Sequence, residues 1–356
     1  MNILTFDVEE WFHLLDCDDT RSENEWKSFD VRIHENIERI FRILEETNTK
    51  ATFFIIGWIA KTYPDVVKRI SERYQIGCHT MNHQLVHHQT KNEFRQDVEA
   101  GIKILEDITG KKVESFRAPG FSVRESEAWV YEILYENGIK YDCSVFPAHH
   151  AHGGMPSFPK SQPSIIEYNG IQIKEFPVSY KKILGQNIMF SGGGYFRLFP
   201  YNLIKSWTKD SENYNMVYIH PRDLDAKQPI IKSLPLSRKF KSYVGLSGAE
   251  KKLRKYLSDF DFVDILEADK KIEELQDGII YYQNKKFYRR AKDYTYHDDE
   301  VEYQQPEYTE VTLTASSYIP DSYYVKDGDK IIPDTAKEFS ASKVYYKREI
   351  VPGAKV

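Results

Sequence analysis

The sequence of 356 residues lacks the features that mark several large classes of protein. It has only three cysteines, Cys17, Cys78 and Cys143, which are far apart, so neither a disulfide framework nor a Cys-x-x-Cys metal site is expected. No stretch approaches the roughly 20 apolar residues of a membrane span. No basic and apolar leader precedes Asp7, so no signal peptide is expected. Together these absences predict a cytoplasmic protein with reduced thiols.

An excess of basic charge is also missing. The net charge is -5 and the pI is about 6.2, so nothing in the composition points to a nucleic-acid partner. No glycine-rich dinucleotide fingerprint follows the first apolar run. The chain is long enough for one large domain and a smaller one.

The first two-thirds of the chain alternate short apolar runs with amphipathic segments. We expect strands over 3–6, 51–56, 75–78, 113–116, 139–141 and 216–219, and helices over 33–46, 65–74, 91–108 and 122–137. The last two helices begin at the capping boxes Thr90–Glu93 and Ser122–Glu125. This alternation predicts an α/β fold with mostly parallel strands.

Polar residues gather just after the expected strands. They are Asp7, His79, Arg117, Asp142 and His220. On a barrel these strand ends share one face, which is where barrel enzymes carry their active sites. A barrel or partial barrel therefore fits better than an open sheet.

Composition changes near residue 275, beyond which tyrosine is dense and helical periodicity is lost. We expect a catalytic domain over 1–275 and a small β-rich C-terminal appendage over 276–356. An acidic linker is expected around Asp298–Glu300.

The pair His79 and His83 suggests a metal site. Two imidazoles four residues apart can face one metal ion if the segment makes a single helical turn. The acidic cluster Asp7–Glu10 can supply a third ligand and a general base, and His220 can supply an acid. A metal, a base and an acid are what the hydrolysis of an unactivated amide requires.

These residues resemble the polysaccharide deacetylase family of carbohydrate esterases over roughly residues 2–268. The matching motifs are Thr5–Glu10, His79–His83, Arg117–Gly120, Asp142–Pro147 and Val217–Pro221. The segments Asp7–Phe12, Gly192–Arg197 and His220–Val244 are further similar to a subfamily associated with exopolysaccharide and lipopolysaccharide biosynthesis. The resemblance implies a deformed (β/α) barrel.

The resemblance also implies residue roles. Asp7 would be the general base, Arg117 would orient it, and His220 would protonate the leaving amine. His79 and His83 would bind a divalent metal, usually zinc, and the backbone N–H of Gly120 would help hold the oxyanion. The chain departs from the family at Val8, which stands where a metal-binding aspartate is usual. Glu9 is the expected replacement, with Glu10 as the fallback.

Three further residues are candidates for contact with substrate or for support of the site. Asp142 either orients an active-site group or caps a turn, and Tyr195 and Arg197 either contact sugar or phosphate or pack in the core.

The expected activity is the removal of N-acetyl groups from an amino sugar of a surface polysaccharide or its lipid- or nucleotide-linked precursor. One alternative on the same fold is an allantoinase-like hydrolase of small cyclic amides. Another is a non-catalytic glycan-binding surface or virion protein, which the tyrosine-rich tail suggests.

Overall fold

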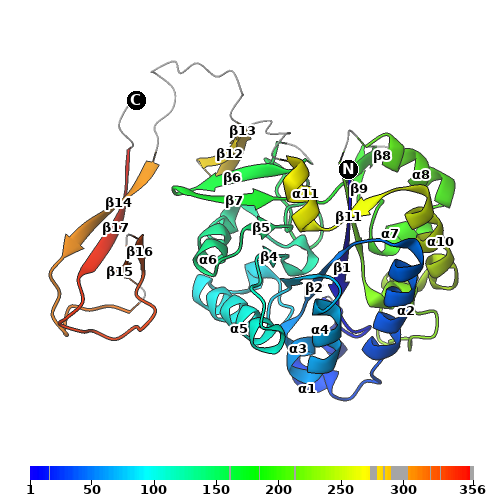
Figure 1. The fold of residues 1–356 in the computed structure, drawn as a ribbon, viewed down its shortest axis with the longest axis horizontal. Helices are drawn as coiled ribbons and strands as arrows, with labels where there is room; N and C mark the ends of the chain where they lie inside the picture. Colours follow the sequence, from blue (N-terminus) through cyan, green and yellow to red (C-terminus); the bar gives the residue numbers. More distant parts are fainter. Residues whose placement is uncertain are drawn as a thin grey trace.

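The computed structural model describes residues 1–15, 17–159, 162–183, 185–211, 214–272, 279–283, 285–289, 304–320, 322–328 and 330–352. An 11-stranded sheet organises most of these residues, and Figure 1 shows helices packed around it. Its parallel strands are β1 (Asn2–Val8), β2 (Thr52–Ile55), β3 (Gln75–Cys78), β4 (Ser115–Phe116), β5 (Tyr141–Asp142), β7 (Ile171–Glu175), β10 (Asn215–Ile219) and β11 (Phe262–Val263).

The order of the strands follows the chain over most of the sheet. Strands lie in the order β10-β1-β2-β3-β4-β5-β7, with β11 also paired to β1. A parallel sheet needs a crossover between successive strands, and the amphipathic helices supply it. The expected α/β fold with a deformed (β/α) barrel is confirmed.

The helices match the expected pattern in most places. They are α1 (Glu23–Trp26), α2 (Ile33–Thr47), α3 (Gly57–Thr62), α4 (Pro64–Ser71), α5 (Lys91–Thr109), α6 (Val130–Glu136), α7 (Gly193–Leu198), α8 (Tyr201–Lys209), α9 (Leu236–Tyr243), α10 (Leu246–Asp259) and α11 (Ile265–Ile272). Short 3-10 turns are η1 (Asp18–Thr20), η2 (Val86–His88), η3 (Pro119–Phe121), η4 (Glu125–Glu127) and η5 (Pro221–Leu224). Among the described residues no helix is long and apolar enough to cross a membrane.

The two predicted capping boxes have different outcomes. Thr90 Oγ1 accepts the Glu93 N–H at 3.2 Å and begins α5 as expected. The capping box at Ser122 is wrong, because its hydroxyl instead accepts the Val86 N–H at 3.0 Å. The chain then makes η4, and α6 begins only at Val130.

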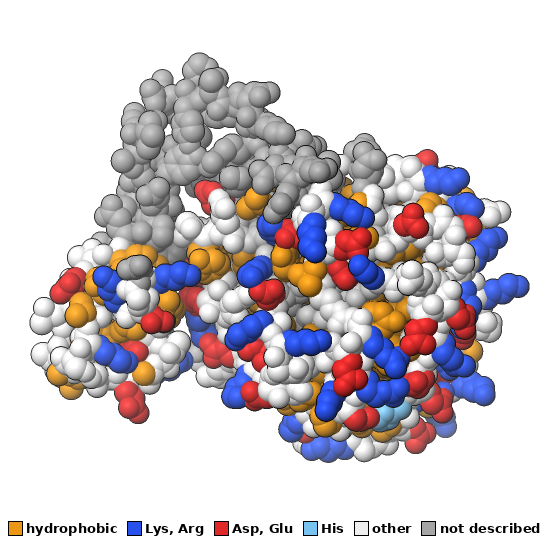
Figure 2. Space-filling model, viewed as in Figure 1, with side chains coloured by type: hydrophobic (Ala, Val, Ile, Leu, Met, Phe, Trp, Pro, Cys, Tyr) orange, Lys and Arg blue, Asp and Glu red, His pale blue; other side chains and the backbone are white. Residues whose placement is uncertain are grey.

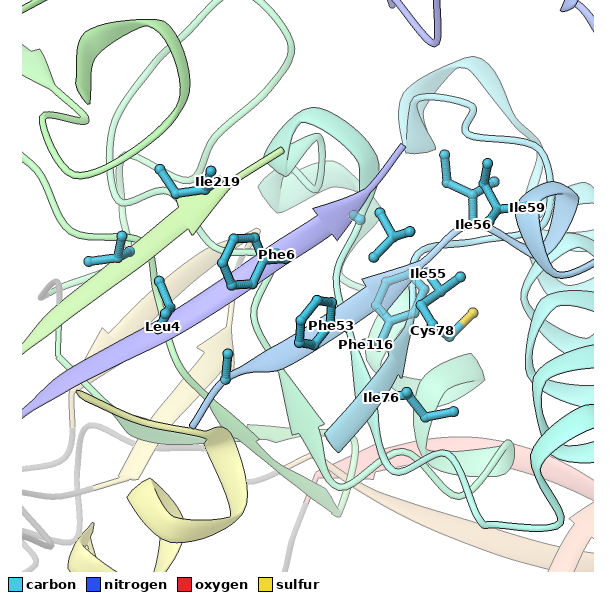
Figure 3. Packing of buried hydrophobic residues seen from close by; sticks show 14 of the residues in the cluster. Leu4, Phe6, Phe53, Ile55, Ile56, Ile59, Ile76, Cys78, Phe116 and Ile219 are labelled. Atoms are coloured by element: carbon cyan, nitrogen blue, oxygen red, sulfur yellow. The ribbon is translucent and has the colours of Figure 1, made fainter. Parts of the chain in front are cut away.

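The hydrophobic core lies between the sheet and its helices. Figure 3 shows Leu4, Phe6, Phe53, Ile55 and Ile219 extending from neighbouring strands into one packed layer. Each of them is 0% exposed, and burying such a side chain contributes about 1.5–3 kcal/mol. This packing fixes the positions of the strand ends.

The sheet continues beyond β7 with mixed pairing. Strand β6 (Ser164–Tyr168) runs antiparallel to β7, β12 (Ile279–Gln283) pairs parallel with β6, and β13 (Lys286–Arg289) pairs antiparallel with β12 at the edge. Strands β8 (Lys181–Ile183) and β9 (Gln186–Ile188) form a separate hairpin. Because β12 and β13 belong to the main sheet, strand pairing crosses the expected boundary at residue 275, and that boundary stays a prediction.

A second sheet follows near the end of the chain. It contains β14 (Gln304–Val311), β17 (Tyr345–Pro352), β15 (Tyr324–Asp327) and β16 (Lys330–Pro333), and Figure 1 shows it beside the main body. Its packing is aromatic, with the Tyr345 ring 2% exposed and stacked 5.8 Å from the Phe339 ring centroid. The expected acidic linker lies outside the described residues.

Candidate metal-dependent active site

Parallel strand register brings the predicted site residues to one face. Phe6 pairs with Ile219 of β10, Ile55 with Cys78, and Cys78 with Phe116. The residues that follow these strands are therefore side by side, although they are far apart in sequence. Glu9, His79, Arg117 and His220 all occupy such positions.

Three donor atoms converge at the centre of this face. Glu9 Oε1 lies 3.2 Å from His79 Nε2 and 2.9 Å from His83 Nε2. The three ligand atoms all lie within 4.8 Å of one another, and all three residues are buried. Burial raises the pKa of Glu9, but the neighbouring His83 and His220 outweigh it and hold the pKa well below its usual range.

The backbone orients the first histidine. His79 Nδ1 donates to the Arg117 carbonyl at 2.7 Å, so its Nε2 presents a lone pair to Glu9 and His83. Metal-binding histidines are commonly held in this way by a hydrogen bond from the second ring nitrogen.

The loop that carries the second histidine is not the helical turn that the spacing predicted. Thr80 and His83 have positive φ values of 63° and 55°. Asp97 of α5 holds the bend by accepting the Met81 N–H at 3.0 Å and the Asn82 N–H at 3.1 Å. The Asp97 carboxylate, distant in sequence, therefore takes the place of the hydrogen bonds of a helical turn. The imidazoles of His79 and His83 still both reach Glu9.

Glu10, the fallback ligand, is engaged elsewhere. Its Oε1 accepts the Arg32 and Ile33 N–H groups at 2.7 and 2.8 Å, at the start of α2. Its Oε2 accepts the Trp11 N–H at 3.2 Å. Burial raises its pKa to about 7 against these hydrogen bonds. Glu10 thus caps a helix, while Glu9 is the carboxylate that the structure brings to the two histidines.

Asp7 and Arg117 form a buried ion pair beside the donor atoms. Arg117 Nη1 donates to Asp7 Oδ1 at 2.6 Å and to Thr5 Oγ1 at 2.8 Å, and the guanidinium lies over the Phe54 ring at 4.3 Å. Arg117 is 0% exposed and Asp7 is 3% exposed. With Oδ1 occupied, Asp7 Oδ2 faces His220 Nε2 at 3.9 Å.

His220 lies opposite, at the end of β10. Its Nε2 is 3.8 Å from Glu9 Oε1, and its Nδ1 is 2.9 Å from Asp223 Oδ2. Asp223 in turn accepts from Arg197 Nε at 2.9 Å. Burial lowers the pKa of His220, but Glu9 and Asp223 outweigh it and raise the pKa to about 9. The imidazole is thereby held as a proton donor.

Arg197 does not face the donor cluster directly. It is 5% exposed, and its Nη1 and Nη2 donate to the carbonyls of Val244 and Lys241 at 2.6 and 3.0 Å. It acts on the site through Asp223. Tyr195, two residues earlier, is 36% exposed and stacks on Phe199 with the ring centroids 6.0 Å apart.

The glycine run Gly192–Gly194 precedes Tyr195, and α7 begins within it. The backbone there packs closely against the Tyr218 ring. A Cβ on Gly192 would lie 2.0 Å from the Tyr218 ring, so only glycine fits there. Gly193 has a φ of +49°, and a Cβ on it would lie 3.9 Å from His220 Cε1. This segment therefore packs against the strand that carries His220.

Gly120, the candidate oxyanion group, follows Pro119 in η3 with a φ of +60°. A Cβ there would lie 2.8 Å from Leu15 Cδ1. The left-handed backbone and this close approach both require glycine.

Asp142 lies behind the site rather than in it. It is 0% exposed, and its Oδ1 accepts the Cys143 N–H at 2.9 Å and the Ser144 hydroxyl. Burial raises the pKa of Asp142 to about 6 and that of its neighbour Glu175 well above the usual range. Asp142 and Glu175 interact, and Asp142 Oδ2 and Glu175 Oε2 have no hydrogen-bond donor from other described residues, so we infer that the pair shares one proton.

Sequence reasoning missed Asp97, Glu175 and Asp223. Asp223 had a local signal, because it stands three residues after His220 and accepts the His220 N–H at 2.9 Å. Asp97 and Glu175 act only through contacts distant in sequence, so nothing local marked them.

Comparisons with known proteins match two parts of the chain. Residues 19–140 match the family model described as polysaccharide deacetylase, and residues 143–270 match one described as a domain of unknown function (DUF3473). A crystal structure from Mycobacterium smegmatis, assigned to the polysaccharide deacetylases, has a TM-score of 0.54 at 17% identity and covers 77% of this chain and 90% of that one. That likeness shows a shared fold.

Two curated relatives match a part of the chain. A peptidoglycan-N-acetylglucosamine deacetylase of Bacillus cereus is 32% identical over 96 residues, which are 26% of this chain and 35% of the relative. A chitooligosaccharide deacetylase of Azorhizobium caulinodans is 34% identical over 110 residues, 30% of this chain and 50% of the relative. The chain thus spans at most half the length of these relatives. The family model relates residues 19–140 to the polysaccharide deacetylases, and the partial relatives and the shared fold point to the same family.

Proposed function

We propose that this protein is a metal-dependent hydrolase that removes N-acetyl groups from an amino sugar of a glycan. The observation that carries the proposal is the convergence of Glu9, His79 and His83 within 4.8 Å, with Asp7 and His220 beside them. A purely binding protein has no need of a paired base and acid around such a cluster.

The donor set fits a divalent metal. Two imidazole nitrogens and one carboxylate oxygen are the ligands of many catalytic zinc sites, and His79 already has the second-nitrogen hydrogen bond of a ligand. Glu9, His79 and His83 would hold the ion. When bound, it would polarise the amide carbonyl and make water more acidic. We propose zinc as the metal.

The remaining residues divide the proton transfers between them. Arg117 occupies Asp7 Oδ1, so Oδ2 is the oxygen that takes a proton from the attacking water. His220 Nε2 gives a proton to the amine nitrogen as the C–N bond breaks, while Asp223 holds Nδ1. The water oxygen bonds to the carbonyl carbon as the C–N bond breaks, so the products are acetic acid, which ionises to acetate, and a free amino sugar. Asp7 has then gained one proton and His220 has lost one, and proton exchange with solvent restores both side chains.

The exposure of His220, the proposed acid, supports a large substrate that approaches from the surface. The His220 side chain is 22% exposed, whereas the Asp7 side chain is 4% exposed. A sugar nitrogen can thus reach His220 from outside while the water is activated deeper in the site.

The names of the relatives suggest N-acetylglucosamine as the sugar, since those proteins are described as acting on peptidoglycan and chitooligosaccharide. We propose a precursor in exopolysaccharide or lipopolysaccharide synthesis, processed in the cytoplasm, as the substrate. The segments similar to that subfamily, Gly192–Arg197 and His220–Val244, carry the acid and its support.

The test is acetate release from N-acetylated oligosaccharides by metal-loaded protein, with metal content measured in parallel. The wild type is expected to release acetate, and Asp7→Asn is expected to retain metal and lose turnover. Release of no acetate across a broad glycan panel would overturn the proposal. Hydrolysis of a cyclic amide such as allantoin instead would assign the small-molecule alternative.

A further inference from the structure

One segment of the surface differs in composition from the rest of the chain. Every charged residue between Ala226 and Ala249 is basic, although the whole protein has a net charge of -5. The basic residues are Lys227, Lys232, Arg238, Lys239 and Lys241. By contrast, the face in Figure 2 shows basic and acidic side chains interspersed over the main body.

The same segment exposes large apolar side chains. Among the described residues the most exposed are Leu236 at 84%, Ile230 at 61%, Ile319 at 60% and Phe240 at 58%, and only Ile319 lies outside it. Leu236 and Phe240 are four residues apart on α9, so they project from one side of the helix.

Local contacts join these residues into one surface. The Ile231 N–H donates to the Tyr243 hydroxyl at 2.9 Å, which sets the loop carrying Ile230 against α9. Lys239 Nζ donates to the Lys232 carbonyl at 2.7 Å across the same loop. We call Ile230, Lys232, Leu236, Phe240 and Lys241 the basic apolar face.

We propose that the basic apolar face docks the protein onto an anionic lipid bilayer. A short helix with exposed apolar side chains and a basic surround suits the boundary between lipid headgroups and acyl chains. Apolar side chains would enter that boundary, and the lysines would meet lipid phosphates. A second copy of this chain is a less suitable partner. A two-fold contact through this face would bring the lysines of both copies together, and the segment has no acidic residue to pair with them.

The face is physically joined to the active site. Arg197 binds the Lys241 and Val244 carbonyls at the end of α9 and also binds Asp223, which holds His220. Docking would place the acid next to the membrane. If the proposed deacetylase function holds, the substrate is then a glycan carried on a lipid; this consequence alone rests on that function.

The test is co-sedimentation of the full chain with phosphatidylcholine vesicles that contain or lack phosphatidylglycerol. Binding is expected only with phosphatidylglycerol, and it weakens as salt rises. Lys232→Gln with Lys241→Gln is expected to lower partitioning by roughly 25-fold, since each basic residue near an anionic surface contributes roughly fivefold. Leu236→Ser with Phe240→Ser is expected to lower it by at least roughly tenfold.

Ile319→Ser is the matched control, because it removes an equally exposed apolar side chain elsewhere, and its binding should equal that of the wild type. Unchanged thermal unfolding would show that the variants fold. Equal binding to vesicles without phosphatidylglycerol, or a lipid-free dimer abolished by Phe240→Ser, would overturn the proposal. Vesicle binding needs no turnover, so failure of the deacetylase proposal leaves this result separate. The variant that combines Leu236→Ser with Phe240→Ser should cleave soluble oligosaccharide as fast as the wild type.

Discussion

The two halves of the site are supported in different ways. The metal half, Glu9, His79 and His83, is buried and held by backbone groups and by Asp97 from α5. The acid half centres on His220, which is partly exposed and held by Asp223 and Arg197. One half is set deep in the fold, whereas the other is connected through Arg197 to a surface helix.

The two halves also come from different parts of the sequence. The histidine pair falls within residues 19–140, the match to the deacetylase family, whereas His220, Asp223 and Arg197 fall within 143–270. The segment described as a domain of unknown function therefore has a structural role here, which is to supply and hold the candidate acid.

The largest expected effect tests the metal half. Glu9→Gln removes the anionic ligand, so metal content should fall to near zero and turnover should be lost. Glu10→Gln is the matched neighbour: metal content should stay at the wild-type level, while loss of a buried hydrogen bond at the start of α2 lowers the free energy of unfolding by about 1–3 kcal/mol. Elemental analysis and urea denaturation measure the two outcomes. Metal loss in Glu10→Gln but not in Glu9→Gln would reverse the assignment.

A smaller effect tests the acid half. Asp223→Asn weakens the hold on His220 Nδ1, so kcat should fall by about 100-fold, at the lower end of what a positioned proton donor contributes. Metal content and KM should stay unchanged, because the variant leaves Glu9, His79 and His83 in place. Steady-state kinetics with metal analysis provide the check. An unchanged kcat would show that the hydrogen bond between Asp223 and His220 does not serve catalysis.

The smallest effect tests the buried carboxyl pair Asp142 and Glu175, which lies behind the site. Burial raises the pKa values of Asp142 and Glu175, so the folded pair keeps a proton that the unfolded chain loses above a pKa of 4.5 for Glu175. Stability is therefore lost as pH rises above that value, by at most about 1.4 kcal/mol per pH unit for each proton retained. Glu175→Gln replaces the shared proton with an amide hydrogen, so its free energy of unfolding should fall less steeply with pH. Urea denaturation at a series of pH values above 4.5 measures the free energy of unfolding of both proteins. If the two plots of this free energy against pH are parallel, the shared proton is contradicted.

The sequence predicted most of the barrel because its signals were local. Apolar runs and amphipathic periods identified β1, β2, β3, β10 and α5, and the polar residues after the strands identified the face of the site. The helix over 122–137 was placed too early, since Ser122 bonds to Val86 rather than to its own helix. A hydrogen bond between distant segments overrode the local capping pattern.

The sequence by itself determined the candidate residues: two histidines, neighbouring carboxylates, an arginine and a distant histidine, which follow the ends of strands. Only the tertiary structure decided between Glu9 and Glu10, because both are buried acids and only the fold shows that Glu10 caps α2. It also decided that Asp142 lies behind the site and that Asp223 holds His220. Residue types and spacing are properties of the chain, but the direction of a carboxylate depends on the N–H groups that packing brings within reach.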